Sequence, residues 1–487
     1  MPSFPPLRLR EANEAPNDLK GRYVLYWMIS ARRASWSFAL DRAVTLCREL
    51  GKPLLVLEPL RAGYPWASDR LHAFVLQGMA DNAAAFAAAG VTYLPYVEPR
   101  PGAGRGLLEA LADRACAVVT DSFPASFLPR MVAAAAGRLR VRLEVVDGNG
   151  LLPIEAVPRA PLTAHAFRRA LQRLLPAHLG AFPSARPLQA AGLRGARLPP
   201  GVARRWPRAP AALLRAEPAA LARLPIDHAV PPAPRTGGTT AARAALRAFV
   251  RRGLARYADD RSHPDLDATS GLSPWLHFGH LSAHEVFRSV ARAEGWTPAS
   301  LGSRRDGGRE GWWGMSPAAE AFLDQLVTWR ELAFGFSAHR DDAGSYDGLP
   351  PWARATLERH AADPRPWRYG LAELEVAATH DPLWNAAQRQ LRAEGRIHNQ
   401  LRMLWGKKIL EWSPGPRAAW EALVALNDRW ALDGRDPCSY AGLGWCLGRF
   451  DRPWGPERPI FGTVRYMSSD AARRKLKLKA YLARHAG

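Results

Sequence analysis

Five short apolar runs that alternate with helix-like stretches constrain the fold of the N-terminal part more than any other feature. The runs are Tyr23–Ile29, Leu54–Pro59, Val91–Val97, Cys116–Asp121 and Val141–Asp147. Between them, residues 36–50 and 69–89 carry apolar side chains at helical intervals. Strands that alternate with helices build βαβ units and a parallel sheet with helices on both faces. The sequence predicts a doubly wound α/β domain over residues 22–180, preceded by a disordered or draped arm over residues 1–21.

The rest of the chain changes character twice. Residues 181–240 are rich in Pro, Ala and Arg and include the breaker-rich segment VPPAPRTGGTT, which predicts a long surface connection between domains. Beyond Thr240 apolar residues recur at helical spacing, as Phe322 and Leu326 do. The sequence therefore predicts an all-α C-terminal domain over residues 241–487. No GxGxxG motif follows the first apolar run, so the standard dinucleotide fingerprint is absent.

Charge and cysteine usage bound the function. The formal net charge is +22, which indicates a polyanionic partner; an Arg- and Ala-rich composition from a GC-rich genome is the plainer explanation. The cysteines have neither metal nor disulfide spacing and read as buried thiols of a reducing compartment: Cys47, Cys116, Cys438 and Cys446. With no secretory signal and no apolar run of about 18 residues, we expect a monomeric cytoplasmic protein, nucleoid-associated if bacterial, without a metal.

Tryptophan is concentrated in the helical part, where 14 of the 18 lie after Leu254. A single Trp is usually a core residue. In a basic helical domain the concentration also suits stacking of bases or of a flavin, or electron hopping between indoles. In the predicted helix Asn399–Trp412, Trp405 and Trp412 are two turns apart, which is about 10 Å of rise on one face.

Two further motifs carry polar chemistry. TSGLSPWLHFG (Thr269–Gly279) places hydroxyls and free N–H groups at a helix start, which suits phosphate binding or a plain helix cap. LNDRWALDGRDP holds Asn427 and Asp433 before a turn, which is consistent with a helix end as well as with a binding site.

Together these motifs resemble class II cyclobutane pyrimidine dimer photolyases, of the photolyase/cryptochrome family. The matches are dense from Tyr257 to Met467 and weaker over residues 22–155. The resemblance implies a deoxyribodipyrimidine photolyase that binds FAD noncovalently. It would split dimers in double-stranded DNA by light-driven electron transfer from reduced FAD. It also allows for a second, antenna chromophore of unspecified kind.

The resemblance assigns roles residue by residue. Asn427 would face flavin N5, and Arg402 with Asp433 would lie beside the ring. Trp405 would be nearest the flavin, with Trp384 and Trp412 further out and Tyr369, Asp451 and Arg452 as a polar cluster near the outer end. The implied FAD-binding residues are Tyr257, Thr269, Ser270, Gly271, Leu272, Ser273, Arg402, Asn427 and Asp433.

On the substrate face, Trp329 and Trp445 would clasp the flipped dimer, Met403 would touch it, and Arg261 would lie near its phosphates. This chain has Gln325 where the family has a glutamate, and Ser262 where it usually has Asn. These departures keep a cryptochrome-like FAD photoreceptor without repair as the alternative. An enzyme for (6–4) lesions, using His398 as proton donor, and a colourless non-catalytic nucleic-acid-binding protein are the remaining readings.

Overall fold

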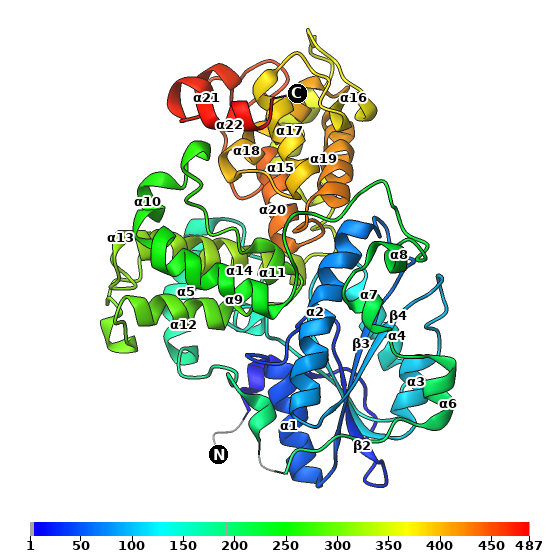
Figure 1. Cartoon of the computed structure of the whole chain (residues 1–487). Coiled ribbons are helices and arrows are strands. Elements are labelled where there is room, and N and C mark those ends of the chain that lie inside the picture. Colours follow the sequence, from blue (N-terminus) through cyan, green and yellow to red (C-terminus); the bar gives the residue numbers. More distant parts are fainter. Residues whose placement is uncertain (1–3, 191, 487) are drawn as a thin grey trace. The chain divides into compact units, whose positions relative to one another are not determined.

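The computed structural model describes residues 4–190 and 192–486 (Figure 1). These residues form two compact units. Unit 1 contains the described residues of Met1–Pro158, Leu174–Arg247 and Leu272–Ala293. Unit 2 contains those of Arg159–Arg173, Ala248–Gly271 and Glu294–Gly487. The units therefore do not follow the predicted boundaries at residues 180 and 240, because each one is assembled from separate segments of the chain.

A six-stranded sheet forms the core of unit 1. Its strands are β1 (Leu9–Glu11), β2 (Tyr23–Trp27), β3 (Leu54–Leu60), β4 (Thr92–Val97), β5 (Ala115–Asp121) and β6 (Leu143–Val146). Their order is β1-β6-β5-β2-β3-β4, and every pair is parallel except β1 with β6. The five predicted strands and the parallel sheet are confirmed.

Alternate residues of the buried strands pack on opposite faces of this sheet. On β2, Leu25 joins a cluster that includes α3 (Leu107–Ala112) and α4 (Leu128–Ala136). Its neighbours Val24 and Tyr26 join a cluster with α1 (Phe38–Leu50) and α2 (Asp69–Ala88). Helices thus cover both faces, which confirms the doubly wound α/β architecture.

The N-terminal arm follows the draped alternative, and the predicted linker contains short helices. Residues 9–11 form β1, and the Asp18 amide donates to the Cys116 carbonyl at 2.9 Å; residues 1–3 lie outside the described part. In the predicted linker, the Arg194 carbonyl accepts from the Leu54 amide at 2.9 Å, and the Ala196 amide donates to the Leu54 carbonyl at 3.2 Å. This region belongs to unit 1, and several of its Leu and Trp side chains are buried. It contains short helices that its composition hid: α6 (Pro200–Arg205), α7 (Ala211–Leu214) and α8 (Pro218–Leu221). Helix α9 (Thr239–Ala248) begins where it ends.

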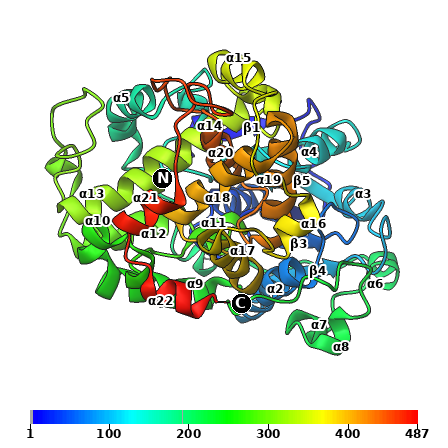
Figure 2. The ribbon, with the colours of Figure 1, turned by 90° about the horizontal axis from the view of Figure 1, so that it is seen from above.

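The regular secondary-structure elements of unit 2 are helices in the described residues. Its helices are α5 (Ala164–Leu174), α10 (Tyr257–Asp260), α13 (Pro317–Leu323), α14 (Arg330–Ala338), α15 (Pro351–Arg359), α16 (Leu371–Glu375), α17 (Pro382–Glu394), α18 (Asn399–Trp412), α19 (Pro416–Trp430), α20 (Pro437–Cys446), α21 (Ser469–Lys475) and α22 (Lys479–Arg484). Figure 2 shows α18 lying between α17 and the pair α19 and α20, all of which it contacts. Two more helices, α11 (Ser273–His277) and α12 (Ala283–Ala293), belong to unit 1.

The central helix α18 begins and ends where the sequence predicted. The helical spacing of Phe322 and Leu326 does not correspond to one regular α-helix, because a π-helical turn, η9 (Asp324–Trp329), separates α13 from α14. Such a turn widens the backbone by one residue, which apolar spacing does not reveal, and it is common at functional sites. In the described part of the chain, no helix combines the length and apolarity needed to cross a membrane.

Candidate functional site

Three polar residues that the sequence singled out meet inside unit 2. Arg402 of α18 donates from Nη2 to Asp433 Oδ1 at 2.9 Å and to Asn427 Oδ1 at 3.3 Å. The side chains of Arg402 and Asp433 are only 15% and 16% exposed. A guanidinium held by a carboxylate at a partly buried site is a fixed positive group with N–H donors to spare.

Hydrogen bonds to three side chains fix the orientation of the Asn427 amide. It is 1% exposed, Ser439 Oγ donates to its Oδ1 at 3.0 Å, and its Nδ2 donates to Asp428 Oδ1 at 2.8 Å. Asp428 is itself fixed by the Tyr440 hydroxyl at 2.8 Å. In this orientation one amide N–H remains for a ligand. A cation beside a pre-oriented amide suits a flavin ring, whose reduced form is negatively charged.

A chain of three buried indoles starts one turn along α18 from Arg402. Trp384 of α17 stacks on Trp405 with centroids 6.4 Å apart and planes 4° apart, and meets Trp412 edge to face at 5.4 Å. Trp384 Nε1 donates to the Trp405 carbonyl at 3.0 Å, and Trp405 Nε1 to Gln388 Oε1 at 2.9 Å. Trp384 therefore bridges the two indoles of α18, and the order in space is Trp405, Trp384, Trp412.

The chain continues from Trp412 to side chains near the surface. Tyr369 and His380 lie 5.3 and 5.4 Å from the Trp412 ring, and Trp367 stacks on His380 at 4.3 Å. Tyr369 thus lies at the outer end, as predicted. The contacts of Asp451 and Arg452 are instead with Trp454: Trp454 Nε1 donates to Asp451 at 3.2 Å, and the Arg452 guanidinium lies 4.6 Å from its ring.

The π-helical turn η9 carries two of the predicted substrate residues on one face. Gln325 and Trp329 are partly exposed, whereas Asp324 before them and Leu326, Val327 and Thr328 between them are buried. Asp324 accepts from Nε and Nη2 of Arg168, on α5, at 3.0 and 2.8 Å. Among the residues that the structure describes, the Gln325 side chain has no hydrogen-bond partner, so its amide is available to a ligand.

The other predicted substrate residues lie on α10, α18 and α20 or beside them. The Arg261 guanidinium lies 5.3 Å from the ring of buried Tyr257, and burial raises the pKa of that phenol. Ser262 Oγ accepts from Gln400 of α18 at 3.4 Å. Met403 and Trp445 are partly exposed.

The segment Thr269–Ser273 crosses the division between the units after Gly271. Gly271 has a φ of +60°, a conformation that favours glycine, and Leu272 is buried. Helix α11 follows directly and has no side-chain cap. The phosphate-binding role of this segment therefore remains an expectation.

Several residues of the site gave no sequence signal. Ser439 and Asp428 fix Asn427, and His380 contacts Tyr369. Lys407 is 0% exposed and lies 5.3 Å from the Trp445 ring. The one sequence sign that Lys407 would be buried is its spacing. It lies three residues from both Leu404 and Leu410, which are buried on the same helix.

Comparisons with known proteins agree with this arrangement. The chain is 35% identical over 487 residues to the deoxyribodipyrimidine photo-lyase of Methanothermobacter thermautotrophicus, covering 99% of this chain and 98% of that protein. Its fold is similar to a bacterial class III photolyase from Agrobacterium tumefaciens (TM-score 0.67, 19% identity, 97% of this chain and 88% of that one). It is also similar to Synechocystis sp. PCC6803 cryptochrome (TM-score 0.67, 16% identity, 95% and 88%). No protein-family profile matches the sequence.

Proposed function

The chain belongs to the photolyase/cryptochrome family, and from this premise we propose that it is a class II-like photolyase that repairs cyclobutane pyrimidine dimers in DNA. FAD, when bound, reduced and excited by blue or near-ultraviolet light, would supply an electron to the dimer. The family resemblance and the hydrogen-bonded group of Arg402, Asn427 and Asp433 support this proposal. An antenna chromophore would bind to unit 1, at the carboxyl ends of its parallel strands.

The fixed Asn427 amide beside Arg402 is the observation that carries the proposal. Arg402 would place its positive charge beside the flavin ring and favour the negatively charged reduced form. Asp433 holds that guanidinium in place. Asn427 keeps one N–H that would donate to flavin N5, the ring atom that gains or loses a proton. Because Ser439 and Asp428 restrain the amide, no reorganisation is needed when charge moves.

The partly exposed aromatic side chains define the proposed substrate face. Trp329 and Trp445 would stack on the extruded dimer, and Arg261 would contact its phosphates. Photolyases are among the enzymes that take a base out of the helix, which costs least where damage has already weakened stacking. Gln325 would donate to a pyrimidine carbonyl and accept from a ring N–H, but it brings no charge.

A light-dependent repair assay tests the proposal. A dimer-bearing oligonucleotide is incubated with chemically reduced, FAD-loaded protein, illuminated, and separated by chromatography, with a dark sample beside it. Restored pyrimidines only after illumination are the expected result. Flavin-free protein after reconstitution with excess FAD, or FAD-loaded protein that restores nothing in light, would contradict it.

The substitution Gln325→Glu separates repair from sensing. Hydrogen bonds to charged groups are worth about 1.5–3 kcal/mol against roughly 1 kcal/mol for neutral ones. A glutamate is therefore expected to raise the quantum yield or tighten dimer binding. Gln189→Glu, the same change at an exposed position of unit 1, is the matched control and should change neither.

Gln325 and Ser262 are the observation that favours the second candidate, a cryptochrome-like photoreceptor. That reading gains if the wild type repairs nothing and Gln325→Glu restores nothing while FAD stays bound. The (6–4) alternative is weaker, because burial lowers the pKa of His398 to about 4, which leaves that ring neutral and a poor proton donor at physiological pH.

A further inference from the structure

We propose that His380 accepts the phenolic proton of Tyr369 when Tyr369 gives an electron to Trp412, so that this pair forms a proton-coupled outer end to the indole chain. The inference rests on the proposed function, since light-driven oxidation of the indoles starts the sequence. It assigns a chemical role to a histidine that no sequence motif indicated. All the residues involved lie in unit 2.

The hydrogen bonds at Tyr369 set the direction of proton movement. The Tyr369 hydroxyl oxygen accepts from the backbone N–H of His380 at 3.0 Å and lies 2.7 Å from His380 Nδ1. In the His380 tautomer that carries its proton on Nε2, Nδ1 accepts the phenol hydrogen while the phenol oxygen accepts from the amide. An unprotonated imidazole nitrogen at this distance is within direct proton-transfer reach. The backbone bond would remain after the proton has left and would stabilise the oxygen.

The chain places the two residues together through a short helix. Tyr369 precedes α16, whose first turn is closed by Glu373 accepting from the Gly370 amide at 2.8 Å. His380 follows α16 and immediately precedes Asp381, which caps α17 by accepting from the Leu383 and Trp384 amides. The cap on the helix that carries Trp384 thus also positions His380.

In the part of the chain that the structure describes, Trp412 has no protein base on its own indole N–H. Among the described residues, its indole nitrogen has no hydrogen-bond acceptor, whereas those of Trp384 and Trp405 donate at 3.0 and 2.9 Å. A positive charge on Trp412 is therefore relieved by an electron from a neighbour. Tyr369 meets that indole at 5.3 Å and 79°, and it alone brings a base on its hydroxyl.

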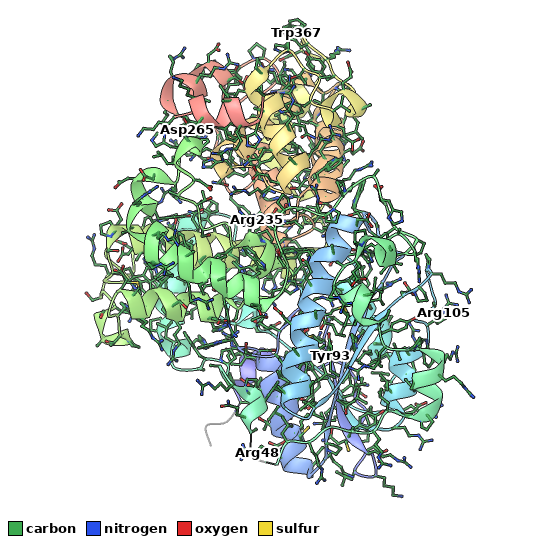
Figure 3. All side chains as sticks on the ribbon, viewed as in Figure 1. Arg48, Tyr93, Arg105, Arg235, Asp265 and Trp367 are labelled. Carbon is green, nitrogen blue, oxygen red and sulfur yellow. The ribbon has the colours of Figure 1, made fainter. Side chains whose placement is uncertain are left out.

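Solvent reaches the accepting base. His380 is exposed, and Trp367, itself 51% exposed, stacks on it with planes 20° apart. Figure 3 places Trp367 at the tip of unit 2, on the loop before α16. The imidazole can therefore pass its extra proton to water, and Trp367 holds the ring in the orientation that Tyr369 needs.

The step balances with one electron and one proton. The radical cation of Trp412, left when that indole has passed an electron inward, takes an electron from Tyr369. The Tyr369 O–H bond breaks and an N–H bond forms at His380 Nδ1. A neutral phenoxyl radical, an imidazolium and a neutral indole remain. An external thiol later supplies a hydrogen atom to the phenoxyl oxygen, which regenerates the phenol, while the imidazolium releases its proton to water.

The decisive variant is His380→Ala in the FAD-loaded protein, because it keeps the backbone N–H and removes the base. After a light flash, transient absorption and electron paramagnetic resonance identify the last radical. The wild type should form a tyrosyl radical that Tyr369→Phe eliminates, and it should form more slowly in heavy water. In His380→Ala the tryptophan radical should persist, with tyrosyl formation slowed by about 10²-fold, the size of a typical general-base effect.

Chemical rescue and a matched control separate proton transfer from structure. Added imidazole should restore tyrosyl formation in His380→Ala, because the site is exposed. His165→Ala, the same change at an exposed position of α5, is the matched control and should leave the tyrosyl yield unchanged. A wild-type rate of tyrosyl formation in His380→Ala without imidazole would overturn the inference, as would a terminal radical on Trp367.

A dark experiment keeps this inference distinguishable from the proposed function. The same proteins are mixed rapidly with the one-electron oxidant tris(bipyridine)ruthenium(III), frozen and examined by paramagnetic resonance. The tyrosyl signal that Tyr369→Phe removes should shrink in His380→Ala and return with imidazole. If the wild type shows no photoreduction but passes this test, the light-driven function fails and the Tyr369–His380 pair stands. If the signal does not depend on His380, the pair fails.

Discussion

Lys407 is a buried lysine whose ammonium group is unfavourable in its apolar surroundings. It is 0% exposed, its Nζ has no hydrogen-bond acceptor among the described residues, and the Trp445 ring lies 5.3 Å away. Burial lowers the pKa of Lys407 to about 8. The folded state thus binds this proton less tightly than the unfolded chain does, whose ordinary value is 10.5.

The sign of the resulting pH effect follows from linkage. Below pH 8 the full cost of burying the ammonium is present, roughly 3 kcal/mol for this shift. As the pH rises from about 8 towards 10.5 that cost disappears. Lys407→Met should therefore raise the free energy of unfolding by up to about 3 kcal/mol at pH 7 and by little at pH 10. Denaturant unfolding at both pH values checks this, with exposed Lys477→Met as control. A gain that is equal at both would contradict it.

Trp405 is expected to be essential for photoreduction. Trp405→Phe keeps most of the packing but replaces an indole with a ring that is far harder to oxidise. Oxidised FAD should then stay oxidised under blue light with an external reductant, while repair by chemically reduced protein survives. Losing the Nε1 bond leaves buried Gln388 without this donor, at a cost of about 1–3 kcal/mol. Trp420→Phe, a buried indole of α19, is the control. Wild-type photoreduction in Trp405→Phe would refute the assigned relay.

Part of the candidate site could be predicted from the residue types and their spacing in the sequence. Arg402 and Trp405 lie one turn apart on a helix whose period is plain, so their shared face was predictable. The contacts of Asn427 with Ser439, and of Tyr369 with His380, were not. They join separate helices or loops, and their polar side chains have no periodic signature.

Among the elements, the π-helical turn η9 depends on an ion pair. Arg168 and Asp324 have side chains 6% and 11% exposed, and Arg168 also donates to the Gly307 carbonyl at 3.1 Å. This ion pair connects helix α5 to the turn that carries Gln325. The sequence offered no sign of this, because the partners are 156 residues apart.

Removing one partner of that pair should be costly. Arg168→Met leaves the Asp324 carboxylate buried without compensation, so the free energy of unfolding should fall by about 3–5 kcal/mol. Arg168→Met with Asp324→Leu should recover most of the loss, because no unpaired charge remains. Denaturant midpoints of the two single variants and the double variant measure this coupling. Simple additivity of the two single effects would show that the pair is not coupled.

Elements with strong local signals were predicted well, and those that depend on distant partners were not. The helix α18 was predicted with its observed bounds, Asn399–Trp412. The strand β1 reads only Leu-Arg-Glu and forms because Leu9 to Glu11 find Val146 to Glu144 of β6. The helices of residues 181–240 are short and rich in Pro and Ala, so their burial against unit 1 left no pattern to read.

For the whole molecule, the charge of +22 predicts strongly salt-dependent DNA binding. Each phosphate contact adds about 0.9 to the slope of log affinity against log salt. Affinity for intact duplex should fall by about 10³-fold or more between 50 and 200 mM salt if six or more phosphates are contacted. Damaged duplex should show a similar slope and higher affinity at every salt concentration, because extrusion is cheaper there. Equal affinities for the two, measured by fluorescence anisotropy, would count against a lesion pocket.

The short strand β1 also protects the protein from aggregation through the edge of its sheet. It covers β6, whose residues Leu143–Val146 are all buried. The opposite edge strand, β4, carries Pro95, which cannot donate to a further strand. A chain shortened past Glu11 would leave an apolar edge with unpaired backbone groups, a template for aggregation. Loss of β1 should therefore be detected first as precipitation during expression, before any loss of photochemistry.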